Sequence, residues 1–444
     1  MTTIKRLVTL VLIFPAFISL SYCQTFDHAK MDGLFSVLQN KNLAMGSIAI
    51  SKNGKLIYQR ALGFSKIDGK DTIPANEHTE YRLGSITKMY TATMIFQLIE
   101  EKKLSLKDLL NKFFPEVPNA ARITISDLLY HRSGLANYTN NTNFDEWKDK
   151  RKTHEELIDM IIKQKPSFEP GTMADYCNSN YLLLGYIIEK ISKKTYKAAL
   201  QERIIKKIGL TKTYYGDSTG NEKNEAASYT FFDNHWKADK AVWLENFCGA
   251  GAVISTSGDM LKFINALFTG KLINKNSLSQ MQTLIDGYGM GMFPFSFGAH
   301  NGFGHNGKTE GFASSLTYYP SDKIAIAYCT NGEVYHKAKI LDGVVHIFYN
   351  EPYVIPSFQS IRLSEETLNQ YTGTYKSSSS GIQIVCTKNG DTLQLESRGL
   401  VMKLDALDAA NFRSPQYGFF FEFTDGGKKL IIKDVEIDYE LEKQ

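Results

Sequence analysis

A serine and a lysine three residues apart, Ser85 and Lys88, form the only Ser-x-x-Lys in this chain. They open an apolar segment, residues 86–99, that is predicted to be a helix, so the two side chains share one face. A buried lysine can lose its proton near neutral pH. It can then accept the proton of a serine hydroxyl, which is otherwise a weak nucleophile. Taken alone, the pattern is more typical of a helix-capping serine followed by a surface lysine, so a catalytic interpretation needs further groups.

Tyr176 and Asn178 are candidates for those further groups. A cationic lysine favours the anionic form of a neighbouring tyrosine, so we expect Tyr176 to shuttle protons. The Asn178 amide can accept a hydrogen bond from the lysine and donate one to a substrate carbonyl. A second Tyr-x-Asn stands at residues 138–140. We favour Tyr176 because a Pro-Gly turn at residues 170–172 precedes it and a helix is predicted to follow.

His305 and Gly307 supply a third candidate element. A glycine in a strand lets the backbone approach a ligand closely. His305 could orient a substrate carboxylate or donate a hydrogen bond, and a histidine changes charge near pH 6 to 7. The same tripeptide occurs at residues 300–302, but only His305 is followed directly by a β-rich run, residues 313–319. A purely structural role for the histidine remains open from sequence.

The surrounding elements predict an α/β (α+β) fold in which an antiparallel sheet is flanked by helices and carries an inserted helical subdomain. Strands predicted at residues 46–51 and 55–62 flank an Asn-Gly turn. The chain is then helix-rich from about residue 105 to 212. Further strands are predicted at residues 288–293, 313–319 and 324–329. We expect the first two and the last two of these strands to share one sheet, because strands and helices do not alternate as in parallel βαβ units.

A composition shift after Pro352 and Pro356 marks a predicted domain boundary. Beyond it, short β-like runs are separated by Gly, Asn, Asp and Ser residues, which predicts a small antiparallel barrel or meander. These runs lie at residues 371–375, 382–386, 393–396, 401–404, 418–423 and 430–432.

The first residues are predicted to be a signal peptide, residues 1–23. Lys5 and Arg6 precede an apolar stretch at residues 7–20, which is short for a membrane span. Small residues then precede Gln24, and a lipidated Cys23 is the alternative. We therefore expect an exported mature chain, periplasmic or secreted, with no transmembrane helix.

Composition excludes several functional classes. The formal charge of +4 falls to about +2 without the basic signal residues, which gives no reason to expect nucleic acid as a partner. The cysteines after residue 23 are far apart and contain no Cys-x-x-Cys, so neither a disulfide scaffold nor a zinc ribbon is predicted. The nine histidines show no His-x-x-x-His spacing, and no cofactor is expected.

Taken together, these motifs resemble the serine β-lactamase-related superfamily, which includes class C β-lactamases, D-alanyl-D-alanine carboxypeptidases and family VIII-type esterases. The matching segments occur in the family's order and span roughly residues 30 to 350. They are residues 81–88, 128–135, 168–172, 176–178, 249–251 with 255–259, and 304–312. The C-terminal segment resembles the lipocalin-like β domain appended to many of these hydrolases.

The resemblance implies a role for each candidate. Ser85 would be the nucleophile and Lys88 its proton acceptor, while Tyr176 would pass the proton onward and Asn178 would hold the substrate amide. His131 is expected to stabilise its loop rather than to catalyse.

The third motif implies substrate contacts. His305 and Gly307 stand where many relatives have Lys-Thr-Gly, and the backbone N–H groups of Ser85 and Lys308 would form an oxyanion hole. Because His305 replaces a lysine whose charge suits the carboxylate of penicillins, weak β-lactam hydrolysis is expected.

The sequence thus predicts an exported serine hydrolase that forms an acyl-enzyme on an ester, a D-amino-acid peptide or amide or, weakly, a β-lactam. The alternative is an inactive penicillin-binding-like protein that binds cell-wall peptides. The expected domains are residues 24–352, the hydrolase, and residues 353–444, the β domain. The expected partner is a small-molecule or peptide substrate, and the oligomeric state is left open.

Overall fold

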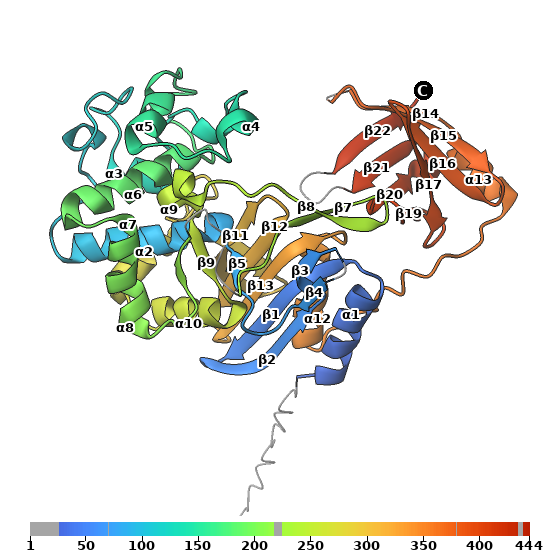
Figure 1. Ribbon diagram of the computed structural model, residues 1–444, viewed down its shortest axis with the longest axis horizontal. Helices are drawn as coiled ribbons and strands as arrows, with labels where there is room; N and C mark the ends of the chain where they lie inside the picture. Colours follow the sequence, from blue (N-terminus) through green and yellow to red (C-terminus); the bar gives the residue numbers. More distant parts are fainter. Residues whose placement is uncertain (1–25, 70, 217–223, 379, 434–437) are drawn as a thin grey trace, which may run out of the picture.

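The computed structural model describes residues 26–69, 71–216, 224–378, 380–433 and 438–444 (Figure 1). The predicted signal segment, including Cys23, lies outside these ranges. Within them, every helix is too short or too polar to cross a membrane.

A six-stranded antiparallel sheet forms the centre of the first 350 residues (Figure 1). Its strand order is β10-β11-β12-β13-β1-β2. The bounds are β1 Ala44–Lys52, β2 Lys55–Leu62, β10 Phe293–Phe297, β11 His300–Thr309, β12 Phe312–Tyr319 and β13 Ile324–Glu333. The prediction that the first two and the last two core strands share one sheet is confirmed, with β1 between β2 and β13.

Helices cover both faces of this sheet. On one face, α1 (His28–Asn40) and α12 (Lys337–Phe348) bury Ile48 and Ile50 of β1. On the other face, α10 (Ser257–Phe268) packs against the side that carries Ala49. Successive strand residues point to opposite faces, so the unbroken burial of residues 44–51 in β1 shows a sheet that is covered on both sides.

The helical block lies between β2 and β10 in sequence and beside the sheet in space (Figure 1). Its helices are α2 Thr87–Glu100, α3 Ile125–Leu129, α4 Phe144–Trp147, α5 His154–Ile162, α6 Asn178–Ser192, α7 Tyr196–Leu200, α8 Lys206–Ile208, α9 Cys248–Gly251 and α11 Lys275–Gln282. Short strands accompany them: β3 Phe64–Asp68, β4 Asp71–Pro74, β5 Tyr81–Arg82, β6 Tyr214–Tyr215, β7 Tyr229–Phe232, β8 His235–Ala238 and β9 Val253–Ser255.

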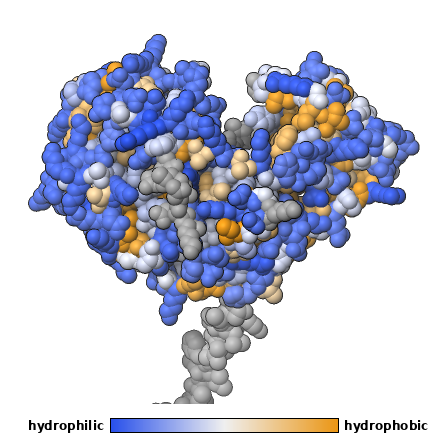
Figure 2. Space-filling view, viewed as in Figure 1, coloured by the Kyte–Doolittle hydropathy of each residue, from blue (hydrophilic) through white to orange (hydrophobic). Residues whose placement is uncertain are grey.

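The C-terminal residues form a nine-stranded, nearly closed antiparallel barrel, as predicted, with strand order β17-β16-β15-β14-β22-β21-β20-β19-β18. It follows α13 (Glu365–Tyr371). The strands are β14 Gly373–Lys376, β15 Gln383–Asn389, β16 Thr392–Ser397, β17 Leu400–Lys403, β18 Asp405–Ala406, β19 Asn411–Ser414, β20 Phe419–Thr424, β21 Lys429–Lys433 and β22 Tyr439–Lys443. Its core is separate from that of the sheet, and Figure 2 shows a notch between the two lobes.

The β7–β8 hairpin joins the two lobes. The backbone N–H of Asn234 donates to the Gln416 carbonyl at 2.8 Å, and the Gln416 side chain donates to Asp233 at 2.8 Å. The rings of Phe232 and Tyr417 lie 5.1 Å apart.

The strand predicted at residues 288–293 is wrong over most of its length. Gly287 and Gly291 adopt positive φ, and Tyr288 closes a tight turn with Ile285, so the extended strand begins only at Phe293. Glycines at positive φ break strand geometry even where the neighbouring residues are apolar.

Candidate active site

Ser85 lies in a single 3₁₀ turn, η1 (Gly84–Ile86), that leads into α2. The preceding Gly84 has φ +54°, and a Cβ there would lie 2.7 Å from the carbonyl oxygen of Lys308. Only a glycine tolerates both the positive φ and this approach. The turn therefore presses against β11 and leaves Ser85 half-buried, at the boundary between the sheet and the helical block.

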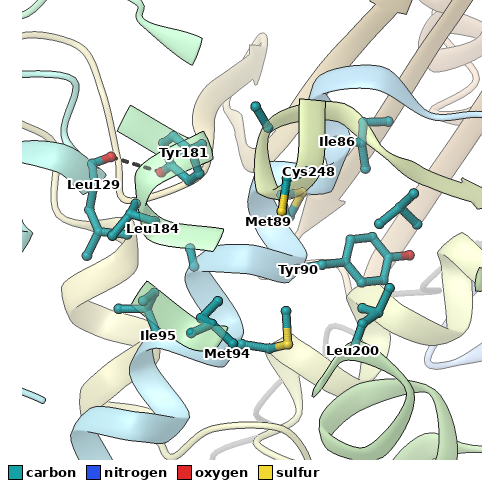
Figure 3. Packing of buried hydrophobic residues seen from close by; sticks show 14 of the residues in the cluster. Ile86, Met89, Tyr90, Met94, Ile95, Leu129, Tyr181, Leu184, Leu200 and Cys248 are labelled. Atoms are coloured by element: carbon teal, nitrogen blue, oxygen red, sulfur yellow. Dashed lines mark hydrogen bonds between the residues drawn. The ribbon is translucent and has the colours of Figure 1, made fainter. Parts of the chain in front are cut away.

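Helix α2 is buried on nearly all sides, which fixes the position of its first turn. Figure 3 shows Met89, Tyr90 and Met94 of α2 among apolar side chains from several helices, and the Tyr181 hydroxyl donating to the Leu129 carbonyl at 2.9 Å. A helix that is apolar all round must lie inside a core. The side chains at its start consequently have little freedom to move.

Lys88 is fully buried, and its Nζ has three oxygen neighbours. They are Ser85 Oγ at 2.9 Å, Asn178 Oδ1 at 2.8 Å and the Ala250 carbonyl at 2.9 Å. Burial lowers the pKa of Lys88 well below its ordinary value, because a charge loses its hydration there. In the neutral amine, the two N–H groups satisfy the two carbonyl oxygens and the lone pair faces the Ser85 hydroxyl.

Tyr176 contacts Ser85 from the other side, and its hydroxyl donates to Ser85 Oγ at 2.7 Å. Its ring centre lies 4.8 Å from Lys88 Nζ. The expectation that Tyr176 favours its anion is wrong: burial raises the pKa of the phenol, and the hydrogen bond with Ser85 offsets this only in part. Tyr176 is therefore a protonated donor at neutral pH.

His131 supports the Tyr176 loop, as predicted. Its Nδ1 accepts a hydrogen bond from the backbone N–H of Cys177 at 3.1 Å, and its ring lies 4.6 Å from that of Tyr176. Burial lowers the pKa of His131 well below its ordinary value, with a smaller contribution from the Lys88 charge. A neutral imidazole can accept from that backbone amide, whereas an imidazolium cannot.

Asn178 makes the predicted contact to Lys88, and its predicted contact to a substrate stays a prediction. Its Nδ2 donates to Thr139 Oγ1 at 2.9 Å. Thr139 belongs to the second Tyr-x-Asn, residues 138–140, which therefore lies beside the site although its tyrosine does not reach Ser85. Sequence reasoning missed Thr139, and the recurrence of Tyr-x-Asn was the one available signal.

His305 lies on β11 and is only 3 % exposed. Its ring centre lies 6.2 Å from that of Tyr176. The expected change of charge near pH 6 to 7 is wrong: burial, and next the Lys88 charge, lower the pKa of His305 to about 3. The imidazole is neutral throughout the physiological range.

Gly307 brings β11 against the Ser85 turn. A Cβ at this position would lie 1.9 Å from the Leu83 carbonyl oxygen, which no side chain tolerates. The same contact places the backbone of Lys308 beside Gly84, with Lys308 N 2.8 Å from the position of a Gly84 Cβ. The Lys308 side chain itself is exposed.

Two aromatic residues that sequence reasoning did not assign to the site extend this wall. Phe293 lies 4.7 Å from His305 and 6.2 Å from Tyr176, ring centre to ring centre, and Tyr288 lies 5.3 Å from Phe293. No spacing connects them with the motifs, because the glycine turns that place them are not periodic.

No trio of His, Cys, Asp or Glu side chains in the described ranges is arranged to hold a metal ion. The four described cysteines, Cys177, Cys248, Cys329 and Cys386, are buried and free. The chemistry present at the site is that of hydroxyl, amine, phenol and amide groups.

Comparison with known proteins assigns the family. The model of the Beta-lactamase family matches residues 32–347. Penicillin-binding protein 4* of Bacillus subtilis (strain 168) is 26% identical over 433 residues, which cover 90% of this chain and 95% of that protein. Teichoic acid D-alanine hydrolase of Staphylococcus aureus (strain MRSA252) is 26% identical over 328 residues, covering 71% and 77%.

Solved structures agree on the fold. The octameric penicillin-binding protein homologue from Pyrococcus abyssi superposes with a TM-score of 0.67 at 23% identity, covering 94% of this chain and 100% of the other. D-amino acid amidase from Ochrobactrum anthropi SV3 superposes with a TM-score of 0.59 at 26% identity, covering 71% and 97%. The chain therefore belongs to the Beta-lactamase family and is a serine hydrolase.

Proposed function

We propose that this chain is an exported hydrolase that cleaves ester or amide substrates through an acyl-enzyme on Ser85. One observation carries the proposal: Ser85 Oγ lies 2.9 Å from the buried amine of Lys88 and 2.7 Å from the phenol of Tyr176. A base and an acid thus flank one hydroxyl. We further propose that residues 1–23 are the export signal, residues 24–352 the hydrolase domain and residues 353–444 an accessory β domain.

In the proposed acylation step, neutral Lys88 takes the Ser85 proton while Oγ bonds to the substrate carbonyl carbon, and the carbonyl electron pair moves onto its oxygen. When this oxyanion collapses, the bond to the leaving group breaks and Tyr176 donates its proton to the departing amine or alcohol. The Lys88 ammonium then returns a proton to Tyr176. In deacylation, water takes the place of the leaving group and attacks the acyl-enzyme, and the same proton transfers run in reverse. The carboxylic acid is released and the Ser85 hydroxyl is restored.

The backbone N–H groups of Ser85 and Lys308 are the proposed oxyanion donors. Support comes from the two glycine contacts that hold the Ser85 turn against β11, at Gly84 and Gly307. Fixed backbone donors stabilise charge that develops in the transition state, and loss of one typically costs about 100- to 1000-fold in rate.

We propose D-aminoacyl esters and amides as the substrate class, with β-lactams as poor substrates. Two relatives are named for such activities: the S. aureus protein is a teichoic acid D-alanine hydrolase, and the O. anthropi protein is a D-amino acid amidase. The neutral His305 itself offers no positive charge to a substrate carboxylate, so substrates with an uncharged leaving group are favoured.

Turnover of a substrate panel by matched serine variants tests this proposal. The panel contains a D-alanyl ester, a D-amino-acid amide, a D-Ala-D-Ala peptide and a chromogenic cephalosporin. Ser85→Ala should lower kcat at least about 1000-fold on every substrate that the wild type cleaves. Ser279→Ala, on the exposed face of α11, is the control and should be unchanged. Wild-type turnover by Ser85→Ala would overturn the proposal, as would a wild type that binds these compounds without cleaving any.

A further inference from the structure

The loop at residues 137–140 connects to the base through a chain of hydrogen bonds. Asn178 Nδ2 donates to Thr139 Oγ1 at 2.9 Å, and Thr139 Oγ1 donates to Asn137 Oδ1 at 2.9 Å. At the other end, Asn178 Oδ1 accepts from Lys88 Nζ at 2.8 Å. Thr139 therefore stands two hydrogen bonds from the amine that faces Ser85.

Backbone amides fix the direction of this chain. The N–H groups of Asn178 and Thr139 both point at Asn137 Oδ1, at 3.2 and 3.4 Å. Because backbone N–H groups can only donate, the atom facing them must be the acceptor oxygen of the Asn137 amide. The single Thr139 proton goes to that oxygen, so Thr139 can only accept from its other neighbour. Asn178 must then turn its NH₂ toward Thr139 and its oxygen toward Lys88.

The loop that carries Thr139 is itself held in place. Tyr138 is fully buried, and its hydroxyl donates to the Asn246 carbonyl at 2.8 Å. Its backbone N–H donates to Ser179 Oγ at 3.0 Å, and Ser179 Oγ donates to the Ala136 carbonyl at 2.6 Å. Thr139 is thus presented to Asn178 by a fixed backbone.

We propose that Thr139 is a positioning residue for the base: its hydroxyl locks the Asn178 amide so that an acceptor oxygen always faces Lys88 Nζ. This inference rests on the proposed function of Ser85 and Lys88. With the Asn178 oxygen and the Ala250 carbonyl occupying both N–H groups of the neutral amine, the lone pair has only Ser85 to accept from. An inverted amide would offer its own N–H to that lone pair and compete with Ser85.

The substitution Thr139→Val keeps the side-chain shape but removes the hydroxyl, so the Asn178 amide is free to invert. We expect kcat to fall on the order of 10-fold, a part of the full contribution of general-base catalysis. An inverted amide also removes one acceptor from the Lys88 ammonium, so the acidic limb of the kcat/KM profile should move to lower pH. Thr139→Ser should restore both wild-type values. Thr142→Val, at an exposed position two residues beyond this loop, should change neither.

The other titratable groups around Lys88 Nζ are unchanged in these variants. They are Tyr176, Cys177, Tyr181, His131 and His305. The inference is overturned if the Thr139→Val protein keeps both the wild-type kcat and the wild-type position of the acidic limb of the kcat/KM profile. A fall in kcat with an unmoved limb also overturns it, because that is what general loosening of the loop would give. Fluorophosphonate labelling of wild-type Ser85, run in parallel, separates this failure from failure of the proposed function itself, which would leave Ser85 unlabelled.

Discussion

Strand β11 carries the same tripeptide twice, and the two copies have different environments. His300 is partly exposed, pairs with Asp322 at 2.8 Å and stacks on Tyr349 with ring centres 3.8 Å apart. His305 is 3 % exposed, and its pKa is lowered to about 3. One copy forms a hydrogen bond at the surface near a hairpin end, and the other lines the candidate active site.

The difference teaches that neighbouring elements, and not the tripeptide, decide the role. Residue 300 pairs with Phe297 at the β10–β11 hairpin, whereas residue 305 pairs with Leu316 in the middle of β12. Five residues along a strand move the side chain to the opposite face of the sheet as well as about 17 Å along it. Only the second position faces the Ser85 turn.

The largest expected effect separates the two glycines of these tripeptides. Gly307→Ala places a methyl 1.9 Å from the Leu83 carbonyl oxygen, and it should displace the Ser85 turn and lower kcat about 100-fold. Gly302→Ala meets neighbours no closer than 3.0 Å and should cost about 1 kcal/mol of stability with kcat little changed. Steady-state kinetics and thermal unfolding of both variants check this. Equal losses of kcat would break the comparison.

The next effect concerns substrate charge. His305→Lys restores a cation beside the site, so the ratio of kcat/KM for a D-Ala-D-Ala peptide over that for a D-amino-acid amide should rise about 10-fold, equivalent to about 1.4 kcal/mol. His300→Lys, on the same strand, should leave the ratio unchanged. A ratio that does not move in His305→Lys would show that His305 has no part in selecting the leaving group.

A smaller effect is a pH dependence of stability. The pKa of His305 is about 6.5 in the unfolded chain and about 3 in the folded one. At a pH between these values, His305 is protonated in the unfolded chain and neutral in the folded chain. This histidine therefore destabilises the fold as pH falls below about 6.5, by up to about 1.4 kcal/mol per pH unit. Denaturant unfolding at pH 8 and pH 5 should show that the free energy of unfolding of His305→Gln, relative to that of the wild type, is higher at pH 5 than at pH 8. A constant difference between the two proteins would contradict the burial argument.

The smallest expected effect is that of replacing His300, the histidine of the first tripeptide. His300→Gln removes a partly exposed pair with Asp322, which is worth about 0–1 kcal/mol, and it should leave kcat unchanged. A loss of activity in this variant would mean that the hairpin end and the site are coupled.

Regular elements were predictable because their patterns are local. The helix predicted at residues 86–99 is α2, with each end shifted by one residue, and the run at residues 313–319 is β12 apart from one added residue. The turn at residues 285–292 was missed because apolar residues there alternate with glycines whose φ angles break the strand. The sequence pattern records the apolar residues but not the φ angles.

The site was predictable where motif spacing fixes geometry and not where burial fixes chemistry. Ser85, Lys88, Tyr176 and Asn178 meet as expected. The protonation of Tyr176 and His305 was misjudged, because a pKa depends on how completely the fold excludes water. Thr139 was missed since its contact with Asn178 spans 39 residues and arises only from tertiary packing.

Covalent capture of Ser85 tests the central claim most directly. Wild-type protein treated with a fluorophosphonate should gain a single adduct, located by mass spectrometry on the peptide containing Ser85. Lys88→Met should slow the labelling at least about 100-fold, because the hydroxyl loses its base. An adduct that forms equally fast in Lys88→Met, or one located on another serine, would contradict the account.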